Sequence, residues 1–302
     1  MLSGIAAFPA LAQEEVVEPP LSVIDWLEEV PAELPPDQAL LSETPVVDSG
    51  IAPTVEAQPL DGADAPSVGV VGPAASGLPA SLWQGARGAE IARAFNALPD
   101  EALAPVATLR TGLLLASAAA PVGVESERFL LERVQRLRAL GQAGQALALL
   151  EAAEPLTPAL FAEYADLSLI TNRDEAACAM LADTPALSSD LSFRVFCLAR
   201  GSDWNAAALA LQTGEVLGDI PPAKAELLAQ FLEPELVTGP PRDLADMPIT
   251  PLVVRLREAI GYPLSTASLP RVFAQADLRP EMGWKAQLEA AERLALTGAA
   301  PA

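Results

Sequence analysis

Apolar and polar residues follow each other in the middle of the chain with a period of about 30 residues. Gly141, Thr171 and Gly201 each open a short polar turn, and five residues later an alanine begins a run rich in Ala and Leu. These alanines are Ala146, Ala176 and Ala206. A repeat of this length is typical of helical hairpins that bury their apolar faces only by stacking on their neighbours. The pattern therefore predicts stacked antiparallel helical hairpins.

Capping residues and prolines mark where the expected helices begin. Thr157-Pro158 and Thr250-Pro251 each combine an N-cap residue with a proline at the first helical position. No segment alternates with a period of two, so the chain is predicted to be all-α. The expected helices span residues 80–97, 101–119, 125–140, 145–153, 158–170, 174–182, 190–200, 203–217, 222–232, 251–261 and 283–296.

The helix expected at residues 125–140 is strongly amphipathic. Leu130 and Val134 lie on its apolar face, whereas Arg133, Arg136 and Arg138 are expected to point elsewhere. The helical repeat domain is expected to cover residues 80–298.

Residues 13–79 have the composition of a disordered, acidic, proline-rich linker. Residues 1–79 contain 12 prolines and 13 acidic residues but neither Lys nor Arg. Such a segment cannot bury enough apolar surface to offset the entropy of ordering it. One apolar island interrupts it at residues 21–30, where Ile24, Trp26 and Leu27 cluster. The island is either a docking peptide for a groove on another protein or a cap on its own helical array.

The first 12 residues are similar to the end of an export signal. An apolar run ends in Ala10-Leu11-Ala12 and is followed by Gln13, which predicts cleavage between Ala12 and Gln13. No basic stretch precedes the run, so we expect the reading frame to begin further upstream. The predicted location is the periplasm, with no transmembrane anchor in the mature chain. The alternative is an apolar N-terminus on a cytosolic protein.

The two cysteines fit an oxidising compartment. Cys178 and Cys197 lie on consecutive expected helices, each on a face that is apolar. Adjacent antiparallel helices would bring the thiols together, which predicts a disulfide. The alternative is a pair of reduced, buried thiols.

Charge and composition exclude several functional classes. The net charge is −22, which disfavours nucleic acid and anionic membrane surfaces as partners. The chain has no histidine, and two cysteines alone cannot fill a tetrahedral zinc site. No phosphate-binding loop, dinucleotide fingerprint or nucleophile elbow occurs. We therefore expect no cofactor, no metal and no catalytic residues.

Two further features could contribute to binding. Trp204 begins an expected helix directly after a Gly-Ser-Asp turn, and it is either a packing residue between repeats or a ligand contact. Charged residues cluster near the C-terminus, either as a polar site or as a solvated helix face with an i, i+4 ion pair between Glu289 and Arg293. The cluster consists of Asp277, Arg279, Lys285, Glu289, Glu292 and Arg293.

Four stretches resemble a family of exported helical-repeat proteins of alphaproteobacteria, some of which carry the label "antifreeze glycopeptide". They lie at Ile24–Leu27, Phe196–Ala207, Leu269–Arg279 and Gly283–Ala295. The resemblance implies a tetratricopeptide-like solenoid with further helical sequence after Gly298. It implies no activity and no functional residues, and the chain lacks the regular Thr-Ala-Ala array that ice binding would need.

These observations together predict a protein-interaction or scaffold module of the cell envelope. Its partner would be an envelope protein or peptide that docks on the stacked hairpins, while the island around Trp26 docks elsewhere. One alternative is an enzyme that cleaves an envelope polymer with two carboxylates, which would need two facing acids in a deep cleft. Another alternative is a purely structural spacer. The oligomeric state does not follow from the sequence.

Overall fold

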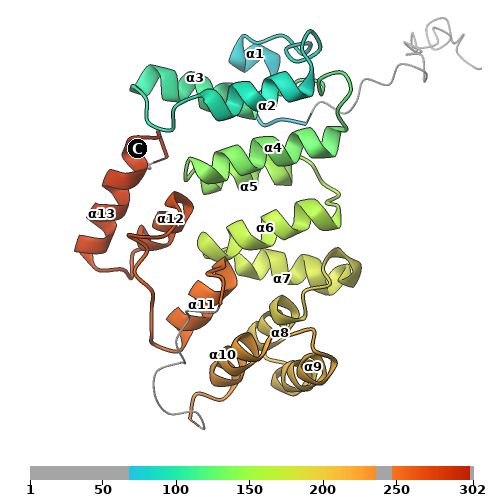
Figure 1. Ribbon diagram of the computed structural model, residues 1–302, viewed down its shortest axis with the longest axis vertical. Coiled ribbons are helices and arrows are strands. Elements are labelled where there is room, and N and C mark those ends of the chain that lie inside the picture. Colours follow the sequence, from blue (N-terminus) through green and yellow to red (C-terminus); the bar gives the residue numbers. More distant parts are fainter. Residues whose placement is uncertain (1–67, 236–246, 300–302) are drawn as a thin grey trace, which may run out of the picture. The chain divides into compact units, whose positions relative to one another are not determined.

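The protein is all-helical in the part that the computed structural model describes, residues 68–235 and 247–299. These residues belong to one compact unit, Pro59–Ala302. Thirteen α-helices and no strand occur among them (Figure 1). The α-helices are α1 Pro73–Ser76, α2 Gly88–Ala97, α3 Ala104–Leu115, α4 Ser126–Ala139, α5 Ala143–Glu151, α6 Pro158–Ile170, α7 Asp174–Asp183, α8 Leu191–Arg200, α9 Trp204–Leu217, α10 Pro222–Leu232, α11 Pro251–Ala259, α12 Ala274–Asp277 and α13 Trp284–Ala295. Short 3-10 segments lie at η3, Pro185–Leu187, and at η5, Arg271–Phe273.

The same turn joins the two helices of three successive hairpins, α4–α5, α6–α7 and α8–α9. Its central residue has a positive φ, which is 79° at Gly141, 59° at Asn172 and 67° at Ser202. In each turn the next N–H donates to the carbonyl five residues earlier, over 2.8 to 2.9 Å. This pattern closes a helix C-terminus with a left-handed residue. The repeat is therefore real, but its second and third turns are centred one residue after Thr171 and Gly201.

The alanines of the repeat shift with the turns. Ala146, Ala177 and Ala207 each lie five residues after a turn centre, and all three are completely buried. Ala176 is exposed and Ala206 is only half-buried. The predicted repeat, which matched these two residues to Ala146, is therefore displaced by one residue in the second and third hairpins. A small side chain at the buried position allows the two helices of a hairpin to approach closely.

The hairpins pack on one another in chain order. Helix α5 contacts α6, α7 contacts α8, and α10 contacts both α8 and α9. Large apolar residues from all these helices form one continuous core, including Leu137, Phe161, Leu167, Val195 and Leu228. Stacking of this kind buries the apolar face of each amphipathic helix, which gives most of a helix's stability in a protein.

The C-terminal helices turn back onto the earlier ones. Helix α11 packs against α6 and α10 (Figure 1). Segment η5 packs against α4. Buried polar groups hold the end of the segment in place. Arg110 donates to the carbonyl of Thr297 over 2.9 Å, and the Gln142 amide donates to the same oxygen over 3.2 Å. Part of the surface of α4 and α6 is therefore covered by residues of the same chain.

The N-terminal part differs from the expected boundaries. Helix α2 begins only at Gly88, because the preceding turn buries Trp83 against the rings of Phe95 and Phe129. Residues 68–79, expected in the linker, contact the helical unit, and the N–H of Val71 donates to the carbonyl of Leu115 over 3.0 Å. The expectation that Arg133 points away from the core is wrong, because its side chain is fully buried.

Candidate functional site

A groove with a volume of about 820 Å³ lies between α7 and α8. Its apolar lining includes Leu181, Pro185 and Leu198, and the disulfide also faces it. The polar lining comes from Glu175, Arg194, Arg200 and Asp203. Its volume falls in the range of ligand pockets, and its lining mixes an apolar surface with a few charged groups, as binding sites do.

A disulfide joins the two helices that form the groove, as the sequence predicts. Cys178 of α7 and Cys197 of α8 are bonded, with their Cα atoms 5.1 Å apart. The bond closes a loop of about 20 residues, which stabilises the folded chain by about 3 kcal/mol in the chain-entropy model. It also limits how far α7 and α8 can separate, so the groove keeps its width.

Arg200 lies at the edge of the groove and is held by a buried acid. Its Nε donates to Oδ2 of Asp174 over 2.9 Å. The Asp174 side chain is only 2% exposed, whereas that of Arg200 is 52% exposed. Asp174 therefore fixes the orientation of the guanidinium from its buried side, while the other side of the guanidinium remains open to solvent. This arrangement suits the binding of a carboxylate ligand.

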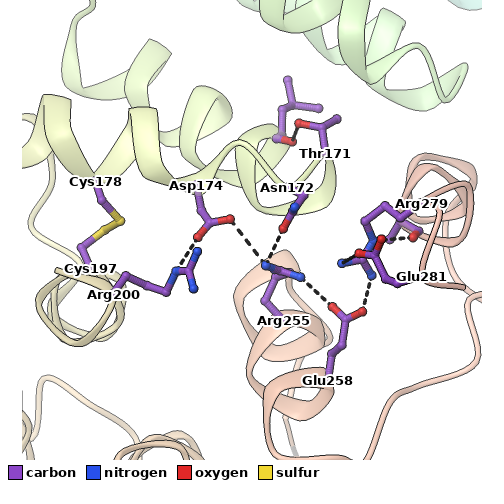
Figure 2. A network of polar contacts seen from close by, with 12 residues as sticks. Thr171, Asn172, Asp174, Cys178, Cys197, Arg200, Arg255, Glu258, Arg279 and Glu281 are labelled. Carbon is purple, nitrogen blue, oxygen red and sulfur yellow. Dashed lines mark hydrogen bonds and ion pairs between the residues drawn. A yellow bond between two sulfur atoms is a disulfide. The ribbon is translucent and has the colours of Figure 1, made fainter. Parts of the chain in front are cut away.

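Asp174 belongs to a chain of alternating charges that crosses to the C-terminal helices. Figure 2 shows Arg200 and Arg255 on opposite sides of Asp174, with Arg255 3.5 Å from its Oδ1. Arg255 also pairs with Glu258 over 2.8 Å, and Glu258 pairs with Arg279 (Figure 2). Burial alone would raise the pKa of Glu258, but its hydrogen bonds to the two arginines and their charges lower that pKa below the usual range. The network thereby orients the groove's arginine relative to α11.

Trp204, the first residue of α9, is half-exposed and does not itself line the groove. It directly follows Asp203, whose carboxylate caps α9 by accepting from the N–H of Ala206 over 3.1 Å. The indole contacts the ring of Phe231, with 6.5 Å between the ring centroids. Trp204 thus packs against α10 and still presents about half of its surface to solvent.

A second cleft, of about 400 Å³, is lined by three acids, Glu163, Asp166 and Asp190. Glu163 and Asp166 of α6 both bind Arg138 of α4, over 2.6 and 2.8 Å. Burial raises the pKa of Asp166 most, and Glu163 and Asp190 add to this, while Arg138 opposes it. One arginine therefore binds both carboxylates and joins α4 to α6.

The two arginines of the charged cluster near the C-terminus, Arg279 and Arg293, have separate partners. Arg279 binds Glu258 and lies 3.6 Å from Glu281. Arg293 donates to the carbonyls of Thr266 and Leu269 over 2.8 Å, rather than to Glu289 as the i, i+4 spacing suggests. Three of the residues, Asp277, Glu289 and Arg293, line a small hollow of about 240 Å³. The cluster therefore mainly ties α13 to the loops around it.

Several expected sites cannot be placed in the structure. The island residues Ile24, Trp26 and Leu27 and the cleavage position at Ala12 and Gln13 lie outside the described residues. Among residues 68–235 and 247–299, no group of three acids or cysteines is arranged to hold a metal ion, and no helix is long and apolar enough to cross a bilayer.

Sequence reasoning missed the pairing that orients Arg200. Asp174 and Arg200 lie 26 positions apart, and Asp174 and Arg255 81 positions apart. One signal was available, because Asp174 and Arg200 occupy the first position of α7 and the last of α8, and these positions meet when consecutive helices are antiparallel.

Comparisons of the chain with protein-family models, curated proteins and solved structures gave no match.

Proposed function

We propose that this protein is an exported helical-repeat module of the cell envelope that binds another protein in the groove between α7 and α8. The groove itself carries the proposal, because it combines a volume of about 820 Å³, an apolar lining and an oriented arginine. The disulfide beside it is compatible with an exported protein.

The repeated turns at Gly141, Asn172 and Ser202 support a tetratricopeptide-like solenoid as the architecture. In such an array the partner would be expected on the exposed helix surfaces. The returning α11 and η5 already cover part of α6 and α4. This favours the open groove between α7 and α8 over the covered surface as the docking site.

The chemistry of the groove indicates what kind of segment it binds. Leu181, Pro185 and Leu198 offer apolar surface, and within the described part of the chain the guanidinium of Arg200 has one partner, Asp174. A peptide segment with apolar side chains and one carboxylate would satisfy both features. Catalysis by the acids of the other cleft is less well supported, because Arg138 binds both Glu163 and Asp166.

Photo-crosslinking tests this proposal. A photoreactive residue at Ala179, which is exposed and lines the groove, should capture a defined segment in the native envelope. The matched control site is Arg128 on α4, whose side chain is 77% exposed. The captured segment is then synthesised and titrated against the protein by fluorescence anisotropy.

We expect the peptide to bind the wild type, and Arg200→Ala to weaken binding about tenfold, as loss of one charge-assisted contact would. The proposal would be contradicted if the photoreactive residues at Ala179 and Arg128 captured the same segment. It would also be contradicted if the peptide bound Arg200→Ala as tightly as the wild type. Capture of residues 21–30 of the same chain would show instead that the island is a cap.

A further inference from the structure

Helix α13 has a second apolar face that no described residue covers. Its inner face packs Ala290 and Leu294 against Ala274, Leu278 and Ala299. The outer face exposes Trp284 and Leu288, which are 76% and 52% exposed. An exposed tryptophan and leucine one turn apart on a single helix are unusual unless another surface covers them.

The outer face continues along the whole helix with a heptad spacing. Trp284, Leu288, Ala291 and Ala295 follow one another at intervals of four, three and four residues. These intervals place all four side chains in one narrow seam, as at the core positions of a coiled coil. We refer to these four residues as the α13 seam. Figure 1 shows α13 at the edge of the helical unit, beside α12.

The order of large and small residues in the seam suits an antiparallel copy of itself. If two α13 helices pair about a twofold axis between Leu288 and Ala291, Leu288 faces the copy's Ala291. In the same register Trp284 faces the copy's Ala295. Each large side chain then meets a small one, which is the complementarity that close helix packing requires.

The charges beside the seam fit the same register. Lys285 and Glu292 lie on one flank of the seam, seven residues apart, and both are exposed. Within the described part of the chain neither side chain has an ion-pair partner. In an antiparallel pair residues on the same flank meet across the interface, so Lys285 of one copy would face Glu292 of the other, twice by symmetry.

We propose that the α13 seam is a self-association surface, on which two copies of this chain pair through antiparallel α13 helices. The occupant is a second copy because size and charge are complementary in a single twofold register. Leu296, which directly follows α13, is also exposed, as is Leu103 before α3. The carbonyl of Leu296 accepts a hydrogen bond from the N–H of Ala102. This inference does not depend on the proposed function.

Sedimentation equilibrium of the full chain tests the inference. We expect a concentration-dependent dimer for the wild type. Leu288→Asp should raise the dimer dissociation constant at least about a hundredfold, because it places a charge in the centre of the seam. The matched control is Leu209→Asp on α9, since Leu209 is also an exposed leucine. The control should leave the dissociation constant unchanged.

A charge-reversal series tests the register. Lys285→Glu and Glu292→Lys should each raise the dissociation constant about tenfold, because each places like charges opposite one another. The double variant should restore the wild-type value. Circular dichroism checks that each variant remains folded, and any variant that does not is set aside in favour of the others in the series.

Each of the following results would overturn the inference. A wild type that stays monomeric up to millimolar concentration has no such surface. A dimer that survives Leu288→Asp, or that Leu209→Asp weakens equally, forms elsewhere. Single charge variants that the double variant does not rescue would show that α13 does not pair in this register. If Leu288→Asp instead makes residues 21–30 newly sensitive to protease in a monomer, the chain's own island covers the seam.

Discussion

Arg133 is the largest side chain that the described part of the chain buries completely. Its guanidinium donates to the carbonyls of Leu114, Val68 and Ala116 over 2.7 to 2.9 Å. Burial lowers its pKa to about 10, so the group is still charged at neutral pH. A buried charge is tolerable when it is hydrogen-bonded, and here each nitrogen of the guanidinium donates to a carbonyl, two of them at the C-terminal end of α3 and one at Val68.

We expect Arg133→Met to lower the free energy of unfolding by about 3 kcal/mol, because it leaves buried carbonyl oxygens without donors. Urea denaturation followed by circular dichroism measures this change. Arg128→Met serves as the control, since the Arg128 side chain is 77% exposed and pairs with Glu132 one turn further along α4. A control effect below about 0.5 kcal/mol is expected for such an exposed pair. Equal effects of the two substitutions would show that the buried hydrogen bonds contribute little.

At the scale of elements, ion pairs connect helices that are distant in the chain. Arg255 of α11 binds Asp174 of α7, and Glu258 of α11 binds Arg279 after α12. The pKa of Glu258 is lowered from 4.5, because its two arginines outweigh the effect of burial. A carboxylate with a lower pKa in the folded state stabilises folding above its unfolded pKa, and this stabilisation is lost as the pH falls through the folded pKa.

We therefore expect Glu258→Gln to lower the free energy of unfolding at pH 7 by about 1 kcal/mol, given partial exposure of the group. The difference from wild type should shrink as the pH falls below 4.5, the ordinary pKa of a glutamate. Chemical denaturation between pH 3 and pH 7 measures it. Glu281→Gln is the control, because Glu281 is mostly exposed and 3.6 Å from Arg279. A difference that grows on acidification would contradict this account.

At the scale of the whole helical unit, the turn after α4 is where the repeat array meets the returning C-terminal segment. The amide of Gln275 donates to the carbonyl of Gly141 over 2.6 Å and to that of Ala299 over 3.3 Å. Gly141 has φ of 79°, and a Cβ atom there would lie 2.5 Å from Cδ2 of Leu294. Only glycine meets both the backbone conformation and the close approach of α13 at no cost.

We expect Gly141→Ala to lower the free energy of unfolding by about 2 kcal/mol, from backbone strain and from displacement of Leu294. Hydrogen exchange should also increase across α13, Trp284–Ala295. Gly144→Ala is the matched control, because a Cβ atom at Gly144 has no neighbour within 4 Å. That substitution lies in α5 and should stabilise the protein by about 0.5 to 1 kcal/mol. If exchange in α13 is unchanged, the turn does not hold the C-terminal segment.

Features determined by residues close together in the chain could be predicted from the sequence, whereas features determined by distant residues could not. Helices α6 and α11 were predicted to begin where they do, because Thr157 and Thr250 cap them through side-chain hydrogen bonds to nearby N–H groups. The second and third turns of the repeat are centred one residue after their predicted positions, because Asn172 and Ser202, rather than a glycine, adopt the positive φ. Helix α12 was missed, since four residues are too few to show a period.

The candidate site was only partly predictable for the same reason. Two cysteines on consecutive helices were enough to predict the disulfide between Cys178 and Cys197. The groove beside it was not predictable, because its lining comes from two helices and the loops at their ends. The pairing of Asp174 with Arg200 could be inferred only from their positions at the ends of consecutive helices, and nothing in the sequence indicated that the outer edge of Arg200 would stay exposed.

The sequence by itself determined the all-α class, most helix boundaries, the period of the hairpins and the disulfide. Each of these depends on residues within about one turn or one hairpin of each other, so local hydrogen bonding and helical periodicity specify them. Only the tertiary structure decided that α11 to α13 return to α4 and α6, that Arg133 is buried, and that the α13 seam stays exposed. These features depend on contacts between distant residues, for which a single sequence holds no periodic signal.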